Sequence, residues 1–385
     1  MILSWKFPLL QSAMFCKAQC RQLLNNFLLL LDFQTTTYLG LKMKKSLLAL
    51  AVFGAFAGAA SAQTNVTIYG VADIGLSRTD TNATEPVWGL TSGQQNGSRI
   101  GFRGTEDLGG GLSAIFTLEN GYNMDTGTLG QGNRLFGRQA FVGLSSTSLG
   151  TIKLGRQYSL NHDALVLLDP FVTNLAGNTE NAAPGYFGGL PYFIAGSAAG
   201  GPGVDIRVDN AVVYQTTNFG GLTGALQYGF GEQTTAFTNG RQIAASLTYA
   251  NGPLTALGTY LTARSTTGAV DQKSYLLGGT YNFGVAKAHV AFQDNTLETV
   301  AAEAESRTLM LGATVPVGPG NALASWIRAD DKNSDAKSDQ IALGYTHPLS
   351  KRTNLYTSAA WQKTEAPAAA EVKATIFNAG IRHLF

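Results

Sequence analysis

Polar and apolar residues alternate along much of the chain from residue 66 to the end. In the segment 66–77, one face of an extended chain would be small or apolar, and it carries Ile68, Gly70, Ala72 and Ile74. The opposite face carries Tyr69, Val71 and Asp73. Successive side chains of a strand point to opposite faces, so the alternation predicts a strand between two different environments. It is typical of strands with lipid or a neighbour on one side and a lumen on the other.

The same period of two recurs in further segments, which gives sixteen expected strands. They are 66–77, 99–106, 112–121, 136–145, 151–158, 211–217, 222–229, 243–249, 254–264, 274–282, 285–293, 308–316, 322–329, 340–347, 354–362 and 374–385. Short connections that carry Gly, Pro or Asn, such as 108–111, alternate with longer polar ones, such as 330–339 and 364–372. Short turns on one rim and long loops on the other are typical of outer-membrane barrels. An even number of strands places both chain ends at the short-turn rim.

One connection differs from the others in its length, because residues 159–209 contain no clear strand. A loop of this length in a compact domain is either functional or disordered. Its apolar and aromatic content argues against disorder. We expect it to fold into the lumen of a wide barrel and to narrow it.

Composition supports a closed barrel. The chain contains 46 Gly, 20 Phe and 14 Tyr, and only 14% of its residues are charged. After residue 62 no stretch approaches the roughly 18 consecutive apolar residues of a spanning helix. Lipid cannot satisfy an open sheet edge, so a chain that spans a membrane without such helices must close its sheet. The part after residue 62 has 21 basic and 24 acidic residues, and this absence of basic bias argues against nucleic acid as a partner.

The apolar run from Met43 to Gln63 has the order of a secretory signal peptide. Two lysines precede an apolar stretch of about ten residues, and the small residues Ala60, Ser61 and Ala62 follow. We expect cleavage after Ala62, and the alternative is a retained membrane anchor. Residues 1–42 hold both cysteines of the chain, and we expect them to come from a start site assigned too early. A genuine pre-segment is the alternative. The expected division is therefore 1–42, a signal peptide at 43–62, and a barrel at 63–385.

The chain ends on a strand-like segment, ATIFNAGIRHLF, whose last residue is aromatic. One face of this segment carries Phe377, Ala379, Ile381, His383 and Phe385. In an outer-membrane barrel such a strand closes the sheet, and we expect Phe385 to be the signal that the barrel assembly machinery reads. An ordinary C-terminal edge strand is the alternative.

Four stretches resemble the general diffusion porins of Gram-negative bacteria, and in particular the Burkholderia-type and Neisseria-type porins. They are VTIYGVADIGLS, SRIGFRGTEDLGGGLSAIFTLENGY, RQAFVGLSSTSLGTIKLGRQY and the ending GIRHLF. The resemblance covers essentially all of residues 63–385. It implies an all-β fold, a sixteen-stranded antiparallel barrel that assembles as a homotrimer in the outer membrane. It also implies that the third long loop folds inward and forms a constriction with basic wall residues facing acidic loop residues.

The resemblance implies particular residues at this constriction. The matching wall positions are Arg99, Arg138, Arg156 and Arg207, and the strand phase adds Arg103, which shares a face with Arg99. An arginine on the lipid face at mid-depth would cost about 2–4 kcal/mol, which favours the lumen, although positions at the rims are the alternative. The corresponding loop acids are Asp163, Asp169 and Glu180. The chain departs from the family here, because it lacks a PEFGG-type motif and its Gly/Ala/Pro-rich run at 183–203 is longer than usual.

The outward faces of the first few strands and of the last strand are the expected trimer contact. Their side chains are small or apolar, as close packing requires: Ile68, Gly70, Ala72, Ile74, Ile100 and Phe102. Plain contact with membrane lipids is the alternative for each of them.

The sequence therefore predicts a passive, water-filled channel for small hydrophilic solutes and ions. With about four cations against three acids, we expect weak ion selectivity, and the sign stays open. No pair among His162, His289, His347 and His383 has metal-ligand spacing, so we expect no metal, no cofactor and no catalysis. The alternatives are a channel specific for an anion or a nutrient, a barrel that acts mainly as a surface adhesin, and a secreted soluble β protein.

Overall fold

The computed structural model describes residues 65–82, 84–178, 206–234, 236–299, 303–367 and 370–385. The chain divides into two compact units, Met1–Ser61 and Ala62–Phe385, and every described residue belongs to the second. The expected signal peptide and the expected extension before it lie outside the described residues. Within the described part of the chain, no helix is both long enough and apolar enough to cross a membrane.

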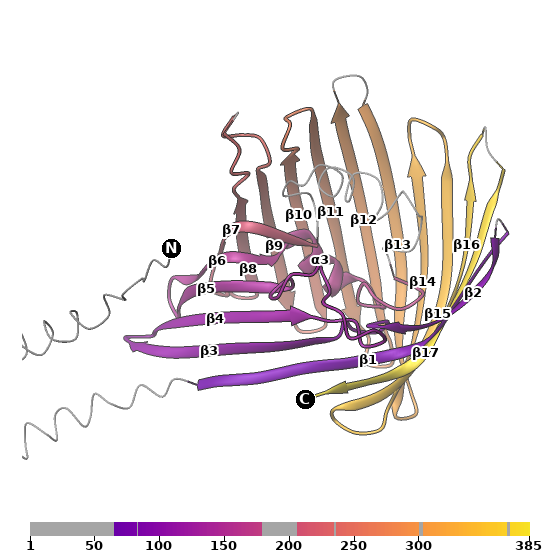
Figure 1. Ribbon diagram of the computed structural model, residues 1–385, viewed down its shortest axis with the longest axis horizontal. Coiled ribbons are helices and arrows are strands. Elements are labelled where there is room, and N and C mark those ends of the chain that lie inside the picture. The colour runs from indigo at the N-terminus through magenta and orange to yellow at the C-terminus, as the bar shows by residue number, and fades with distance from the viewer. Residues whose placement is uncertain (1–64, 83, 179–205, 235, 300–302, 368–369) are drawn as a thin grey trace, which may run out of the picture. The chain divides into compact units, whose positions relative to one another are not determined.

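The described residues form one antiparallel sheet of seventeen strands (Figure 1). The strands are β1 (Asn65–Thr81), β2 (Thr84–Ser92), β3 (Arg99–Gly109), β4 (Leu112–Gly121), β5 (Gln139–Ser146), β6 (Gly150–Tyr158), β7 (Arg207–Gln215), β8 (Leu222–Gly229), β9 (Gln242–Asn251), β10 (Leu254–Arg264), β11 (Val270–Asn282), β12 (Lys287–Thr299), β13 (Glu303–Val317), β14 (Gly320–Asp331), β15 (Lys337–Pro348), β16 (Thr353–Glu365) and β17 (Val372–Leu384). From β3 onward each strand pairs with the next strand in the chain, β1 pairs with both β2 and β3, and β1 also pairs with β17, so the sheet is closed.

The closed sheet has sixteen positions because β2 and β3 share one of them. Both pair with the same side of β1: Thr84–Ser92 with its second half and β3 with its first half. The remaining fifteen strands each occupy one position, so the predicted sixteen-stranded antiparallel barrel is confirmed. Only β2 was missing from the sequence prediction. Nearly all of its residues are exposed, so no buried face marks it in the sequence.

The last residue of the chain completes the closure. The backbone of Phe385 exchanges two hydrogen bonds with Gly70, at 2.9 and 3.1 Å. The Phe385 ring covers the Gly70 backbone so closely that a Cβ there would lie 2.1 Å from a ring carbon. The Phe385 ring can therefore lie against the backbone at position 70 only because glycine has no side chain.

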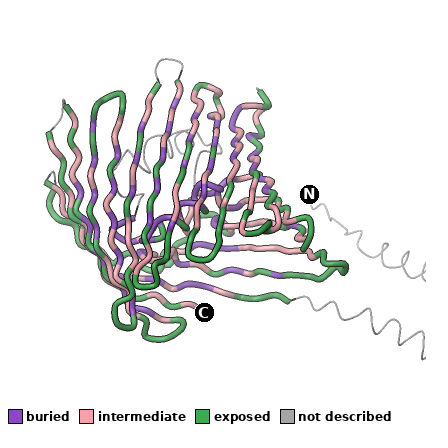
Figure 2. The backbone as a smooth tube through the Cα atoms, turned by 180° about the vertical axis from the view of Figure 1, so that it is seen from behind, coloured by how far each residue is buried: buried purple, intermediate pink, exposed green. Residues whose placement is uncertain are grey.

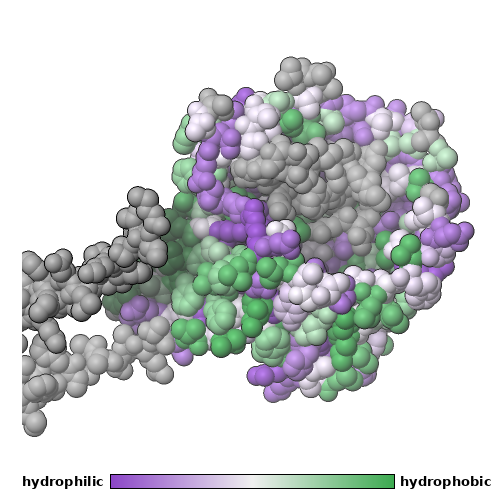
Figure 3. Space-filling model, viewed as in Figure 1, coloured by the Kyte–Doolittle hydropathy of each residue, from purple (hydrophilic) through white to green (hydrophobic). Residues whose placement is uncertain are grey.

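The two faces of the strands differ as the alternation predicts. In β12 the inward residues His289, Ala291 and Gln293 are buried, whereas Val290 and Phe292 between them are exposed. Figure 2 shows this alternation of buried and exposed residues along the strands. Large apolar side chains such as Leu277 (61% exposed) and Leu343 (66%) face outward, and Figure 3 shows hydrophobic residues gathered over the area of β3 to β5. An exposed apolar belt around a closed sheet is what contact with lipid requires.

Several strands extend further toward the long-loop rim than the sequence predicts. Half of the predicted loop 330–339 is strand, since β14 ends at Asp331 and β15 begins at Lys337. Outward ion pairs join these extensions, including Arg328 to Asp339 at 2.7 Å and Arg307 to Asp294 at 2.9 Å. The polar residues that suggested a loop are therefore cross-strand partners, which stabilise a sheet much as apolar pairs do.

The connection after β6 contains a helix, α3 (Leu160–Leu168), which the sequence analysis did not predict. Ser159 caps it by accepting a hydrogen bond from the His162 backbone N–H at 3.2 Å. Leu165 and Leu168 pack in one cluster with inward residues of the wall, among them Met310 and Ile327. This apolar contact holds α3 against the inner face of the sheet.

Candidate functional site

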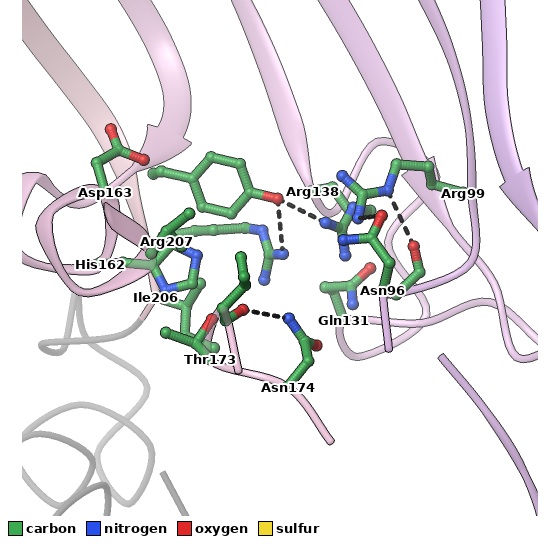
Figure 4. Close-up of a pocket in the computed structure, with 14 residues that line it drawn as sticks. Asn96, Arg99, Gln131, Arg138, His162, Asp163, Thr173, Asn174, Ile206 and Arg207 are labelled. Carbon is green, nitrogen blue, oxygen red and sulfur yellow. Dashed lines mark hydrogen bonds between the residues drawn. The ribbon is translucent and has the colours of Figure 1, made fainter. Parts of the chain in front are cut away.

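A cavity of about 340 Å³ lies beside α3, and side chains from distant parts of the chain line it (Figure 4). Arg99 comes from β3, Arg138 from the residue before β5, and Arg207 from the first position of β7. His162 and Asp163 come from the first turns of α3. The closed sheet and the inward helix thus bring together residues that are separated by more than one hundred positions in the sequence.

A glutamate and a tyrosine hold the arginines in place. Arg138 donates from Nε to Glu119 Oε1 at 2.7 Å, and Arg99 Nη1 lies 3.8 Å from the same oxygen. Arg138 and Arg207 both donate to the Tyr158 hydroxyl, at 2.5 and 3.3 Å. The Arg207 guanidinium also lies over the Tyr158 ring, 4.8 Å from its centre. These contacts offset part of the repulsion between neighbouring guanidinium groups.

The charge that lines this cavity is positive. Among the described residues, its lining includes three arginines and one carboxylate, Asp163, whereas Glu119 is not part of this lining. His162 adds no charge, because its pKa is lowered to about 3. Burial is the largest cause, and the positive charges of Arg207, Arg138 and Arg99 add to it. Its ring stacks on Tyr158 with centroids 4.9 Å apart, as a neutral imidazole can.

Asp163 is the group whose charge can change near neutral pH. Low-polarity surroundings raise its pKa to about 6, and the Lys153 ammonium partly offsets this. Asp163 is nevertheless an exposed residue of the cavity lining.

The structure places the predicted site residues in different surroundings. Arg99, Arg138, Arg207 and Asp163 line the same cavity. Arg103 lies over the Tyr69 ring, 5.1 Å from its centre, and is not part of the lining. Strand spacing puts it about 13 Å from Arg99, closer to the short-turn rim.

The other predicted residues also lie apart from this cavity. Arg156 forms an ion pair with Asp209 at 2.6 Å and donates to the Gly137 carbonyl. Asp169 is buried, and its carboxylate accepts from the backbone N–H of Phe171 and Thr173 at 2.8 and 3.1 Å. Asp169 therefore organises the turn after α3, and its charge is already bound by those donors. Glu180 lies outside the described residues.

Sequence reasoning missed two residues that shape the cavity, Glu119 and Tyr158. Glu119 lies in a strand that was correctly predicted, opposite Gly101 and two register positions from both Arg99 and Arg103, so it shares their face of the sheet. Applying the strand phase to acidic as well as basic residues would have found it. Tyr158 ends the quoted segment GRQY, and nothing in the sequence distinguishes it from the interfacial tyrosines of other strands.

The turn after α3, which lines part of this cavity, is strained. Val172, Thr173 and Leu175 have φ values of 55°, 56° and 60°, a region that such residues rarely adopt. Each costs on the order of 1–3 kcal/mol. Backbone hydrogen bonds hold the turn, including Leu175 N–H to the Gln94 carbonyl at 2.6 Å. The turn is thereby tied to the wall of the barrel at the connection between β2 and β3.

The predicted trimer contact residues form one outward patch on β1 and β3. Ile68 pairs with Phe102 and Gly70 with Ile100 in the register of these strands. Ile68 is 62% exposed and Ile100 37%, whereas Gly70 is covered by Phe385.

A closed, sixteen-position antiparallel sheet with an apolar outer belt and a charged cavity beside an inward helix defines a membrane channel of the porin class. The family described as Gram-negative porin matches residues 48–367, and the chain belongs to this family. It is an outer-membrane porin, as the sequence analysis predicted.

Individual relatives of the chain are also described as porins. The chain is 35% identical to an outer membrane porin of Bordetella pertussis, over 89% of this chain and 100% of the other. It is 38% identical to outer membrane porin protein 32 of Delftia acidovorans, over 84% and 90%. Among solved structures, the anion-selective porin from Comamonas acidovorans aligns with a TM-score of 0.74 and 32% identity, over 84% of this chain and all of that one.

Proposed function

We propose that this porin conducts small hydrophilic solutes by passive diffusion and prefers anions over cations. The observation that carries the proposal is the lining of the cavity beside α3, where three arginines face one carboxylate among the residues that the structure describes. A positive lining raises the local concentration of anions and lowers that of cations. The similar porin from Comamonas acidovorans, which is described as anion-selective, adds support.

The reversal potential of single channels in a KCl gradient tests this proposal. One guanidinium acts on an ion 4 Å away with about 1 kcal/mol in bulk water, so each arginine changes the local anion concentration roughly fivefold. We expect wild-type channels to prefer chloride, by less than about tenfold in permeability, and Arg99→Gln with Arg207→Gln to reduce this preference. Arg328→Gln, on the outer face, is the control and should leave it unchanged. A preference of the wild type for potassium would overturn the proposal.

We also propose that the protein assembles as a homotrimer through the outward patch of β1 and β3. The exposure of the apolar side chains Ile68 and Ile100 on these two neighbouring strands supports contact with a partner there. Ile68→Lys should shift the species seen by native electrophoresis in mild detergent from trimer to monomer. An unchanged trimer would place the contact elsewhere and leave this patch to lipid.

Phe385 is, in this proposal, the residue that the barrel assembly machinery recognises. Its position at the end of the strand that closes the sheet supports this role. Phe385→Ala should lower the amount of folded porin in the outer membrane, whereas the purified variant should still refold in detergent. A loss of refolding in detergent would instead indicate that the contact with Gly70 is needed for the barrel itself.

A further inference from the structure

Two further cavities continue from the arginine cavity toward the short-turn rim. The first, of about 340 Å³, shares the lining residues Asn96, Val166 and Val172 with the arginine cavity. The second, of about 210 Å³, reaches the turn between β15 and β16. These two cavities share a set of lining residues with each other: Gln95, Asn321, Thr346 and Arg382. The three cavities therefore form one series along the lumen.

Four cations line the two further cavities, and we call them the vestibule cluster: Lys287, Lys351, Arg352 and Arg382. In the described part of the chain, none of them has a carboxylate within 4.0 Å. Arg382 donates from Nε to Asn354 Oδ1 at 2.9 Å, which orients its guanidinium. The cluster combines one residue from β12, one from β17 and two from a turn, so the closed sheet creates it.

The acidic groups nearby are bound to other donors. Asp73, whose charge acts on Arg382, accepts from the Tyr356 hydroxyl at 2.6 Å and from the backbone N–H of Gln95 and Asn96 at 3.0 and 2.7 Å. Asp169 lines the first of the two cavities, and its carboxylate accepts two backbone N–H groups of its own turn. Neither carboxylate forms an ion pair with the vestibule cluster.

We propose that the vestibule cluster is a second anion-binding subsite, and that it takes small dianions such as inorganic phosphate or a short dicarboxylate. Several cations around a water-filled space favour a doubly charged solute over chloride, because each adds its attraction for both charges. The amide of Asn321 and the hydroxyl of Thr346 offer neutral donors in both cavities. Two weak sites in series allow an anion to enter at one and leave from the other. The proposal rests on the anion preference proposed above.

Single-channel recording with inorganic phosphate at pH 8, where it is mostly a dianion, tests the proposal. Phosphate is added to one side of the bilayer at a time, in a constant KCl background. The variants are Lys287→Gln with Arg382→Gln and, separately, Lys351→Gln with Arg352→Gln, which changes only an exposed turn and should fold normally. Lys373→Gln is the matched control, since it lies on β17 like Arg382 but on the opposite face, where it pairs with Glu371.

We expect phosphate added from one side to reduce the wild-type current, and each vestibule variant to weaken this effect about tenfold while chloride is still preferred over potassium. Phosphate added from the other side should act within about twofold of wild type in these variants. The proposal is overturned if wild-type current is insensitive to phosphate, or if only Arg99→Gln relieves the effect. A wild-type preference for potassium would instead refute the proposed function.

Discussion

Glu119→Gln tests whether a single buried carboxylate holds the arginine cavity together. Glu119 is 2% exposed, and its carboxylate accepts from Arg138 at 2.7 Å and from the Tyr69 hydroxyl at 2.8 Å. Arg99 lies 3.8 Å from it. The variant keeps the shape of the side chain and removes its charge, so the effects of charge are isolated.

Glu119→Gln should have two effects, one on the stability of the barrel and one on its ion preference. A hydrogen bond to a charged partner contributes about 1.5–3 kcal/mol, and removing one partner of a buried pair costs about 3–5 kcal/mol. Arg99 and Arg138 border a water-filled cavity, which hydrates them partly, so we expect a loss of about 2–4 kcal/mol in the free energy of unfolding. The cavity also gains about one unit of positive charge, so the preference for anions should increase, roughly fivefold at most.

Urea unfolding of the protein refolded in lipid vesicles measures the stability, and the reversal potential in a KCl gradient measures the preference. Glu106→Gln is the control, because Glu106 is an exposed residue of β3 with no salt bridge among the described residues. The reasoning is refuted if Glu119→Gln unfolds at the urea concentration of wild type and keeps its selectivity. A loss of stability without a change of selectivity would mean that the Glu119 charge is not sensed in the lumen.

Three further outcomes are expected. Low-polarity surroundings raise the pKa of Asp163 to about 6, so its carboxylate becomes neutral as the pH falls below that value. Anion preference should therefore rise from pH 7.5 to pH 5, and Asp163→Asn should abolish this rise in the reversal potential. Leu168→Ala leaves a cavity between α3 and the wall and should cost about 2–5 kcal/mol, measured by urea unfolding; a smaller loss would mean that α3 is held mainly by polar contacts. Gly70→Leu collides with the Phe385 ring and should reduce the yield of folded barrel on gels without heating, whereas normal folding would show that the ring can move aside.

The closed sheet could be predicted from the sequence because lipid and lumen impose opposite demands on alternate residues. The inward phase of Arg99 follows from that alternation alone. The depth of a residue along its strand does not follow from the alternation, because a period of two is the same at every depth in the barrel. Arg103 shares the phase of Arg99, yet its place over Tyr69, about 13 Å along the strand, separates it from the cavity.

Arg156 shows a second limit of the alternation. The pairing of β6 with β7 shifts register between Gly155 and Gln157, and Gly155 has a φ of 128°. The extra residue lies in β7, where Val208 to Ala211 oppose the three residues of β6 centred on Arg156, so the phase of β7 cannot be carried across this point. The carboxylate partner of Arg156, Asp209, lies beside a residue of positive φ, Asn210, on the neighbouring strand. Neither irregularity is marked by a change in hydrophobic pattern.

The sign of selectivity was left open by the sequence because counting charges does not say which of them reach the lumen. Of the acids predicted to face the wall arginines, Asp169 is bound by the backbone of the turn after α3. Glu119, which was not predicted, lies behind Arg138 and holds it in place. Among the described lining residues, Asp163 therefore remains as the carboxylate that faces three arginines. A nearly balanced count of charges becomes a positive lining among the described residues because hydrogen bonds occupy Asp169 and Glu119, and the proposed anion preference rests on how the turn and the wall are built.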